Sequence, residues 1–390
     1  MKEHNFNEII ERRNTNSLKY DFAKERKFPE DILPYWVADM DFKTAPPIID
    51  AIKKRSDHGV FGYTLPKEDY YNVINDWFKN HFNFNFEKEW LVLTPGVVLA
   101  ICTAIRSLTS EGDSVIIQQP VYYPFASSIT NNNRNLVVNS LIYKDGKYSM
   151  DFDDFEDKII KNKVKLFILC NPHNPVGRVW TKEELIKLGD ICFKHNVLVI
   201  SDEIHCDFVR PGFTHIPFAS IRKEYTDIAI TCTSPSKTFN LAGLQISNIF
   251  ISNKNLRRKF ESELHKIGFD EPNTFGLVAC MAAYKDGESW LNELKEYLEM
   301  NITRTEDFLR EYLPQVKLVK PEGTYLLWLD FSALGLTDTE LNNLIVNKAN
   351  LWLDHGTMFG DEGSGFQRIN IACPWSLLEK ALINIQKALC

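Results

Sequence analysis

Between residues 90 and 251, short apolar runs alternate with longer amphipathic stretches. The runs at 164–169 and 197–201 are apolar at nearly every position, which is typical of parallel strands covered on both faces. Alternation of such strands with helices predicts an open, mostly parallel α/β sheet flanked by helices. The predicted strands cover residues 91–93, 114–118, 136–143, 164–169, 197–201, 228–231 and 248–251, and the predicted helices cover 97–108, 124–130, 152–161 and 181–195.

The pattern changes after about residue 285, where a long helical period is followed by isolated strands. This part of the chain predicts a smaller α+β domain, with helices at 288–313 and 337–348, strands at 325–331 and 368–372, and a closing helix. The sequence therefore predicts an N-terminal arm that joins the small domain (1–44), a large ligand-binding domain (45–285) and a small C-terminal domain (286–390).

Before residue 90 the pattern is less regular. The run 33–42 is aromatic and extended in character, and the Gly/aromatic stretch 59–66 predicts a loop. Pro66 stands just before a helical apolar period, which predicts a helix start.

Length and charge narrow the class of protein. A chain of 390 residues exceeds the usual size of a single core, so two domains are expected. A net charge of -7 and a pI of about 5.8, without a basic run, argue against nucleic acid or membrane as partner and favour a small molecule. The charged N-terminal sequence and the absence of a long apolar run predict a cytoplasmic enzyme.

The eight cysteines and nine histidines show no metal-ligand spacing. We therefore expect reduced thiols and no metal site.

The candidate chemistry centres on Lys237, which follows Ser234 and Ser236 between two strand-like runs. A lysine with a pKa lowered by desolvation suits a Schiff-base nucleophile, and the cofactor that uses such a lysine is pyridoxal phosphate (PLP). PLP also needs hydroxyl and N–H donors for its phosphate, and a carboxylate for its pyridinium nitrogen. Taken alone, Lys237 is better explained as a solvated loop lysine, as most lysines are.

Polar or flexible residues follow several predicted strands, where ligands bind in open α/β sheets. Gly96, Val97 and Val98 open a helix and offer free N–H groups to a phosphate, although they suit a plain helix start as well. Tyr122 or Tyr123 would stack on a pyridine ring, or would pack in the core as ordinary aromatics.

Two further strand ends carry candidates for polar contacts to the ring. Asn174 lies in a loop with two Asn-Pro dipeptides and offers an amide to a phenolic oxygen. Asp202 ends the predicted strand 197–201 and would pair with the pyridinium nitrogen; the alternative is that it caps the next turn.

With these residues located, the chain resembles the fold-type I PLP enzymes of the aspartate aminotransferase superfamily over nearly its whole length. The resemblance rests on Asn174-Pro-x-Gly, Asp202-Glu, Ser234-x-Ser-Lys237 and Arg368, in order. It implies that the large domain binds PLP as an imine on Lys237, with Asp202 at the pyridinium and Asn174 at the ring oxygen.

The resemblance assigns the remaining positions as well. It implies that Tyr122 stacks on the ring, that Ser234, Ser236 and the backbone of 96–98 bind phosphate, and that His205 lies against the cofactor. Arg368, Ala38 and Tyr123 are the implied substrate contacts. Tyr63 would reach the phosphate of a neighbouring subunit, which implies a homodimer with shared sites.

Two departures narrow the resemblance. Gln245 stands where many members have a phosphate-binding arginine, and His205 stands where the common pattern has tyrosine. With the run 36–42, they look like the MalY/PatB-type carbon–sulfur lyases, also called cystathionine β-lyases. The implied reaction is α,β-elimination of cystathionine or another S-substituted cysteine to a thiol, pyruvate and ammonia. The alternatives are a PLP-dependent aminotransferase and a regulatory binding protein with secondary lyase activity.

Arg368 has two interpretations. We place it at the head of a strand, after the Gly-rich loop 360–365, where its guanidinium would hold a substrate carboxylate through two hydrogen bonds. The alternative is an ion pair with Asp361 or Glu362 across that loop.

Overall fold

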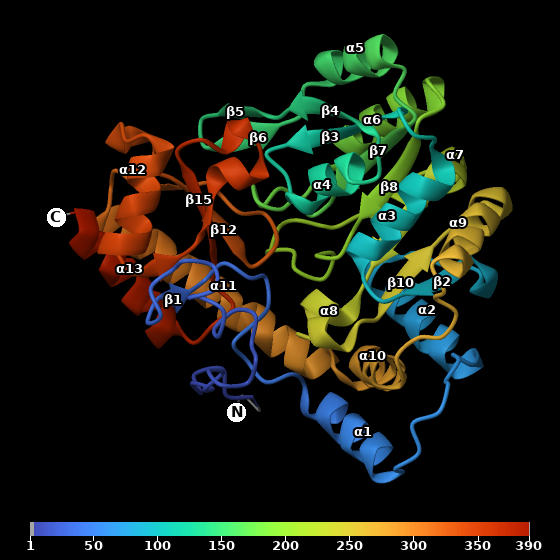
Figure 1. Cartoon of the computed structure of the whole chain (residues 1–390), viewed down its shortest axis with the longest axis horizontal. Helices are drawn as coiled ribbons and strands as arrows, with labels where there is room; N and C mark the ends of the chain where they lie inside the picture. Colours follow the sequence, from blue (N-terminus) through green and yellow to red (C-terminus); the bar gives the residue numbers. More distant parts are fainter. Residues whose placement is uncertain (1–3, 390) are drawn as a thin grey trace.

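The computed structural model describes residues 4–389, arranged as a large sheet with flanking helices and a smaller C-terminal sheet (Figure 1). Within these residues the large sheet has the order β2-β10-β9-β8-β7-β3-β4, and β10 alone runs antiparallel to its neighbours. This confirms the predicted open, mostly parallel sheet. Its strands are β2 (Leu91–Thr94), β3 (Ser114–Gln119), β4 (Asn135–Ser140), β7 (Leu166–Cys170), β8 (Leu198–Asp202), β9 (Ala229–Thr233) and β10 (Ser247–Phe250).

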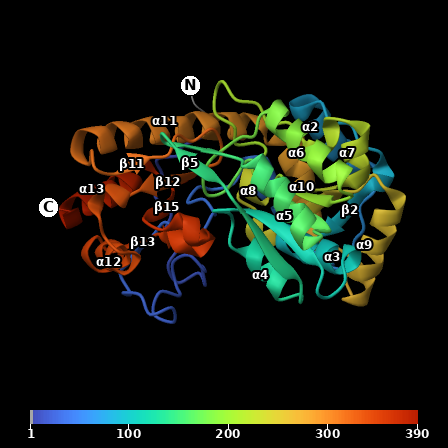
Figure 2. The same cartoon turned by 90° about the horizontal axis from the view of Figure 1, so that it is seen from above.

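Helices cover both faces of this sheet, which explains the continuously apolar strands. Phe167 and Val199 pack into one buried cluster, whereas Ile168 and Ile200 belong to a second cluster on the opposite face. Figure 2 shows one layer of helices on each side of the sheet. The second cluster includes α3 (Val97–Leu108), α4 (Pro124–Thr130) and α9 (Lys254–Lys266), and the first includes α1 (Pro46–Asp57), α2 (Glu68–Phe82), α5 (Phe152–Asn162), α6 (Lys182–Lys194), α7 (Lys223–Ile228) and α10 (Thr274–Asp286).

The C-terminal part is built on an antiparallel sheet with the order β11-β12-β15-β14. The long helix α11 leads from α10 to this sheet (Figure 1). The C-terminal part contains α11 (Glu288–Tyr312), β11 (Lys317–Leu318), β12 (Leu326–Asp330), α12 (Asp338–Asn343), β14 (Asp354–His355), β15 (Phe366–Asn370) and α13 (Trp375–Leu389).

The N-terminal segment packs on the C-terminal part of the chain. Strand β1 (Leu33–Pro34) pairs in parallel with β13 (Leu351–Trp352), and Trp36 stacks on Trp352 with ring centroids 4.4 Å apart. This arrangement suits the arm expected at 1–44; the division at 44 and 285 stays a prediction.

Some elements differ from the sequence-based expectation. The predicted strand 136–143 is two strands, because the chain leaves β4 and forms a hairpin of β5 (Ile142–Lys144) and β6 (Lys147–Ser149). Helix α10 was not predicted, because its own residues are apolar or small on all sides of the helix and therefore give no amphipathic period. Its Gly276 lies so close to the Leu244 carbonyl that a Cβ atom would approach this oxygen to 2.7 Å.

Candidate active site

A cavity of about 210 Å³ lies at the carboxyl ends of the central strands. Register places Cys170, Asp202 and Cys232 in one row, and Thr94 pairs with Ser247 at the same edge of the sheet. The cavity is lined by most of the predicted site residues, namely Ala38, Gly96, Val97, Val98, Tyr122, Asn174, Asp202, His205, Ser234, Ser236 and Lys237. Ala38 of the N-terminal segment and residues of the large sheet region therefore meet around one cavity.

Lys237 lies on the short helix α8 (Pro235–Thr238), which begins directly after β9. Its Nζ donates to the Ala38 carbonyl at 2.7 Å. Burial lowers the pKa of Lys237 to about 8; Asp39 and Asp202 raise it and Arg368 lowers it further. Near neutral pH the uncharged amine is thus roughly two to three hundred times more abundant than for a free lysine.

Asp202 is the last residue of β8 and is almost completely buried. Burial raises the pKa of Asp202 to about 7, although the N–H of Ile204 and the charge of Lys237 lower it. Its Oδ1 accepts from that N–H at 3.1 Å, so the residue also caps the next turn. A buried carboxylate without a bound cation suits a protonated ring nitrogen, and Asp202 therefore fits the pyridinium of PLP.

The other end of the cavity suits a phosphate. Gly96 caps α3 without a side-chain hydrogen bond, and a Cβ atom there would meet nothing within 4 Å. The first-turn N–H groups of α3 therefore face open space at the positive end of the helix. Ser236 lines the same cavity, whereas the Ser234 hydroxyl already donates to the Ile246 carbonyl at 2.7 Å. Gln245 is exposed and does not line the cavity.

Asn174 and Arg368 meet beside the cavity. Arg368 Nη1 donates to Asn174 Oδ1 at 3.0 Å, which leaves the Asn174 amide group to act as a donor. The backbone carbonyl of Asn174 accepts from the N–H of Tyr122 at 3.0 Å, which positions the Tyr122 ring at the cavity.

The expected position of Arg368 is wrong, and so is the alternative to its predicted role. The residue lies in the middle of β15, not at the head of a strand, because pairing with β12 starts at Phe366. Its ion-pair partner is the buried Asp354 of β14, and neither Asp361 nor Glu362 pairs with it in the described chain. Glu362 instead accepts a hydrogen bond from Ser140. Arg368 Nε is buried without a hydrogen-bond partner among residues 4–389.

His205 and Tyr123 flank the site differently. Burial lowers the pKa of His205 to about 3, so its ring is neutral, and Nδ1 has no hydrogen-bond partner in the described chain. Tyr123 does not line the cavity; its ring lies 5.4 Å from Tyr122 and 6.0 Å from Phe359.

Tyr63 lies in a different environment from the other predicted site residues. Its side chain is 94% exposed on the loop before α2 and does not line the cavity. A role at a phosphate would therefore require a second subunit.

The structure also brings in residues that the sequence did not suggest. Tyr325 donates its hydroxyl to the Ala38 carbonyl at 3.0 Å, and Asp39 acts electrostatically on Lys237. Asp354 anchors Arg368. Asp39 belonged to the singled-out run 36–42, but neither spacing nor pattern indicated its contacts.

Comparison with known families gives one match over most of the chain. Residues 36–385 match the model of the family described as aminotransferase class I and II. Among curated proteins, the chain is 45% identical to cystathionine beta-lyase PatB of Bacillus subtilis (99% of this chain, 100% of the relative). It is 34% identical to protein MalY of Escherichia coli (98% of each).

Solved structures agree with these relatives. A PLP-bound protein from Clostridium difficile 630, described as an aminotransferase, is 50% identical, with a TM-score of 0.97 over 99% of this chain and 100% of the other. Cystalysin from Treponema denticola, which contains PLP, is 39% identical with a TM-score of 0.95 (99% and 98%). The PLP-bound C-S lyase from Staphylococcus hominis is 37% identical with a TM-score of 0.93 (99% and 98%).

Proposed function

Because the chain belongs to the aminotransferase class I and II family and is a PLP-dependent carbon–sulfur lyase of the MalY/PatB type, we propose that its substrate is L-cystathionine or a related S-substituted cysteine. The reaction is an α,β-elimination that, with one water, yields a thiol, pyruvate and ammonia. The observation that carries the assignment of the site is Lys237, whose pKa is lowered to about 8, facing a cavity that also contains the buried carboxyl of Asp202.

The lining residues fit PLP at both ends. We propose that Lys237 holds the cofactor, that Asp202 faces its ring nitrogen, and that Ser236 and the N–H groups at the start of α3 hold its phosphate. Asn174 would donate to the ring oxygen, and the Tyr122 ring would lie against the cofactor. When bound, PLP supplies an electron sink that makes the Cα proton of the substrate acidic.

Lys237 is the proposed base for that proton. An amine with a pKa near 8 is well matched to proton transfer near neutral pH, and the Ala38 carbonyl restrains its position. Arg368 is the proposed anchor of the substrate carboxylate, because its Nε has no hydrogen-bond partner in the described part of the chain, while Asp354, Asn174 and the Trp36 carbonyl fix the guanidinium. The Cβ–S bond then breaks and the sulfur leaves with its electron pair.

A homodimer is part of this proposal. Tyr63 lies among other exposed apolar side chains of the loop before α2, namely Val60, Phe61 and Leu65. A second copy would cover this patch and would allow Tyr63 to reach a phosphate of the partner's site.

We also propose a cytoplasmic location, because all described cysteines are free, which suits a reducing compartment. None of the helices in residues 4–389 is long and apolar enough to span a membrane.

Transamination is the rival reaction, because the family contains aminotransferases. The discriminating experiment measures pyruvate and thiol from purified enzyme and L-cystathionine without any keto-acid acceptor. Sustained release over many turnovers is expected for the lyase. Product formation that depends on an added keto acid, with every thioether tested, would instead identify an aminotransferase.

A further inference from the structure

Ala38 lines the cavity, and almost all carbonyl groups of the segment around it, 36–42, accept hydrogen bonds from side chains in distant parts of the chain. Lys237 and Tyr325 donate to the Ala38 carbonyl, and Arg368 donates to that of Trp36. The further donors are Asn370 to Val37 and Asp39 (both 2.6 Å), and Asn240 to Met40 (2.9 Å) and Phe42 (3.0 Å). These hydrogen bonds hold the backbone of segment 36–42 in one position.

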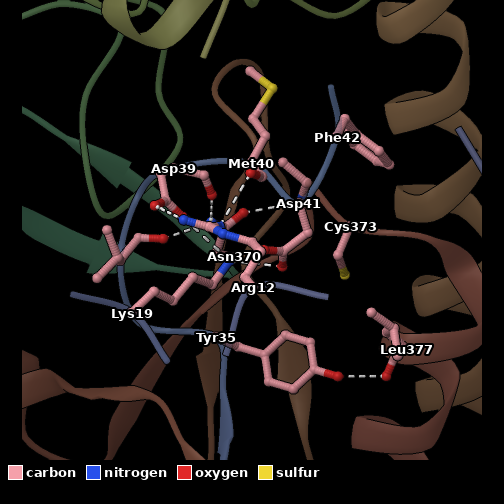
Figure 3. A network of polar contacts seen from close by, with 12 residues as sticks. Arg12, Lys19, Tyr35, Asp39, Met40, Asp41, Phe42, Asn370, Cys373 and Leu377 are labelled. Carbon is pink, nitrogen blue, oxygen red and sulfur yellow. Dashed lines mark hydrogen bonds and ion pairs between the residues drawn. The ribbon is translucent and has the colours of Figure 1, made fainter. Parts of the chain in front are cut away.

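The segment also carries two carboxylates that meet two cations from the N-terminal arm (Figure 3). Arg12 bridges them, with Nη2 2.7 Å from Asp39 Oδ2 and Nη1 2.6 Å from Asp41 Oδ1. Lys19 Nζ lies 2.8 Å from Asp41 Oδ2 and 3.4 Å from Asp39 Oδ1. We call these four residues the arm cluster. Its formal charge is balanced, as buried ions require.

The two carboxylates have different surroundings. The Asp41 side chain is 4% exposed and lies within the cluster, and its N–H donates to the Ala372 carbonyl at 2.9 Å. The Asp39 side chain is 20% exposed and acts on Lys237, in addition to its two cluster cations. Asp39 therefore connects the arm cluster to the active-site lysine.

Asp39 raises the pKa of Lys237, and Lys237 in turn lowers the pKa of Asp39. Although burial raises the pKa of Asp39, the charges of Lys19, Arg12 and Lys237 hold it below its ordinary value, so the group is ionised. The other charged groups that act on Lys237 are Asp202 and Arg368, and the neutral His205 lies at the same cavity.

We propose that Asp39 is a positioning residue for Lys237: held by Arg12 and Lys19, it keeps the Ala38 carbonyl within hydrogen-bond distance of Nζ and provides a fixed negative charge beside that nitrogen. Asp41 supplies the structural pairing of the same cluster. The inference rests on the proposed function, in which Lys237 holds PLP and acts as the base.

The test compares Asp39→Asn with Asp41→Asn, which are isosteric changes of two carboxylates that share both cations. In the holoenzyme, the pH midpoint of the visible PLP absorption band reports protonation of the Lys237 nitrogen. Loss of the Asp39 charge is expected to lower this midpoint by about one unit, the lower end of the effect of an adjacent opposite charge. Asp41→Asn is expected to leave the midpoint near the wild-type value and to lower the Tm more.

Asp39→Glu provides the conservative comparison. It keeps the charge, so its midpoint should return toward the wild-type value, while the longer side chain displaces the Ala38 carbonyl and lowers kcat. If Asp39→Asn does not fold, Lys19→Met with Asp39→Asn removes a balanced pair and leaves Arg12 with Asp41; the same lowering is expected. A purely structural cluster would give equal midpoints in all variants, or equal shifts for Asp39→Asn and Asp41→Asn, and either result overturns the proposal.

The titration needs no thioether substrate. A lowered midpoint in an enzyme that releases no pyruvate would support the role of Asp39 and refute the proposed reaction. Pyruvate release by the wild type, with an unshifted midpoint in Asp39→Asn, would support the proposed reaction and refute the role of Asp39.

Discussion

The arm cluster and the cofactor cavity contain the same kinds of charged group, and each holds both buried and partly buried members, yet their protonation behaviour is opposite. In the cluster, partners hold the pKa of Lys19 above its ordinary value despite burial, and hold that of Asp39 below its ordinary value. In the cavity, burial dominates, so the pKa of Lys237 is lowered to about 8 and that of Asp202 is raised to about 7. Close pairing thus keeps charges fixed, and its absence makes groups available for chemistry.

The largest expected effect comes from removing the unpaired amine. Lys237→Ala should lower kcat/KM for thioether elimination about ten-thousand-fold, or about 5 kcal/mol, because both the cofactor attachment and the base are lost. Pyruvate release and the visible absorption after dialysis measure this. Lys254→Ala, an exposed lysine at the start of α9, is the control and should behave as wild type. A variant that retains more than a tenth of the rate would exclude Lys237 as the base.

The next effect tests the paired region. Asp41→Asn leaves the buried Lys19 without its closest carboxylate and should lower the free energy of unfolding by about 3–5 kcal/mol. Lys19→Met combined with Asp41→Asn removes both charges and should cost less than the single change. Denaturant unfolding monitored by circular dichroism gives the values. If the double variant were the less stable of the two, the charges would not be the source of the effect.

Arg368 combines features of the paired and the unpaired region. It forms an ion pair with Asp354, but its Nε has no hydrogen-bond partner among the described residues. Arg368→Lys should keep the PLP absorption but lower kcat/KM by a factor that corresponds to about 2–4 kcal/mol, because an ammonium cannot keep the fixed contacts of the guanidinium and still offer a donor in place of Nε to the substrate carboxylate. Steady-state kinetics on L-cystathionine provide the measurement. Wild-type kcat/KM in this variant would mean that the carboxylate is bound elsewhere.

The sequence indicated the cavity better than the arm cluster, for a physical reason. Asn174 lies in the loop after one apolar strand and Asp202 ends the next, and the carboxyl ends of parallel strands meet at one edge, so a local pattern was enough to bring them together. Arg12 and Lys19 stand in a polar stretch that reads as an ordinary solvated surface. Their burial depends on how the arm packs on β13 and β15, which no local period encodes. The pairing of Arg368 with Asp354 was missed likewise, because β14 is only two residues long.

The smallest expected effect concerns the stability of the enzyme stripped of PLP. The pKa of Asp202 is about 7 in the folded chain against 3.8 ordinarily, so between these values the folded chain binds more protons than the unfolded chain, and its stability falls as pH rises. Asp39 has the opposite tendency, because its pKa is lowered on folding, but it is present in both wild type and Asp202→Asn and cancels in their difference. From pH 5 to pH 7, Asp202→Asn should therefore gain about 1–2 kcal/mol relative to wild type in denaturant unfolding. If the pH profiles of wild type and Asp202→Asn were parallel, Asp202 would be neutralised by a partner even without PLP. The contrast between the paired and the unpaired region would then fail at Asp202.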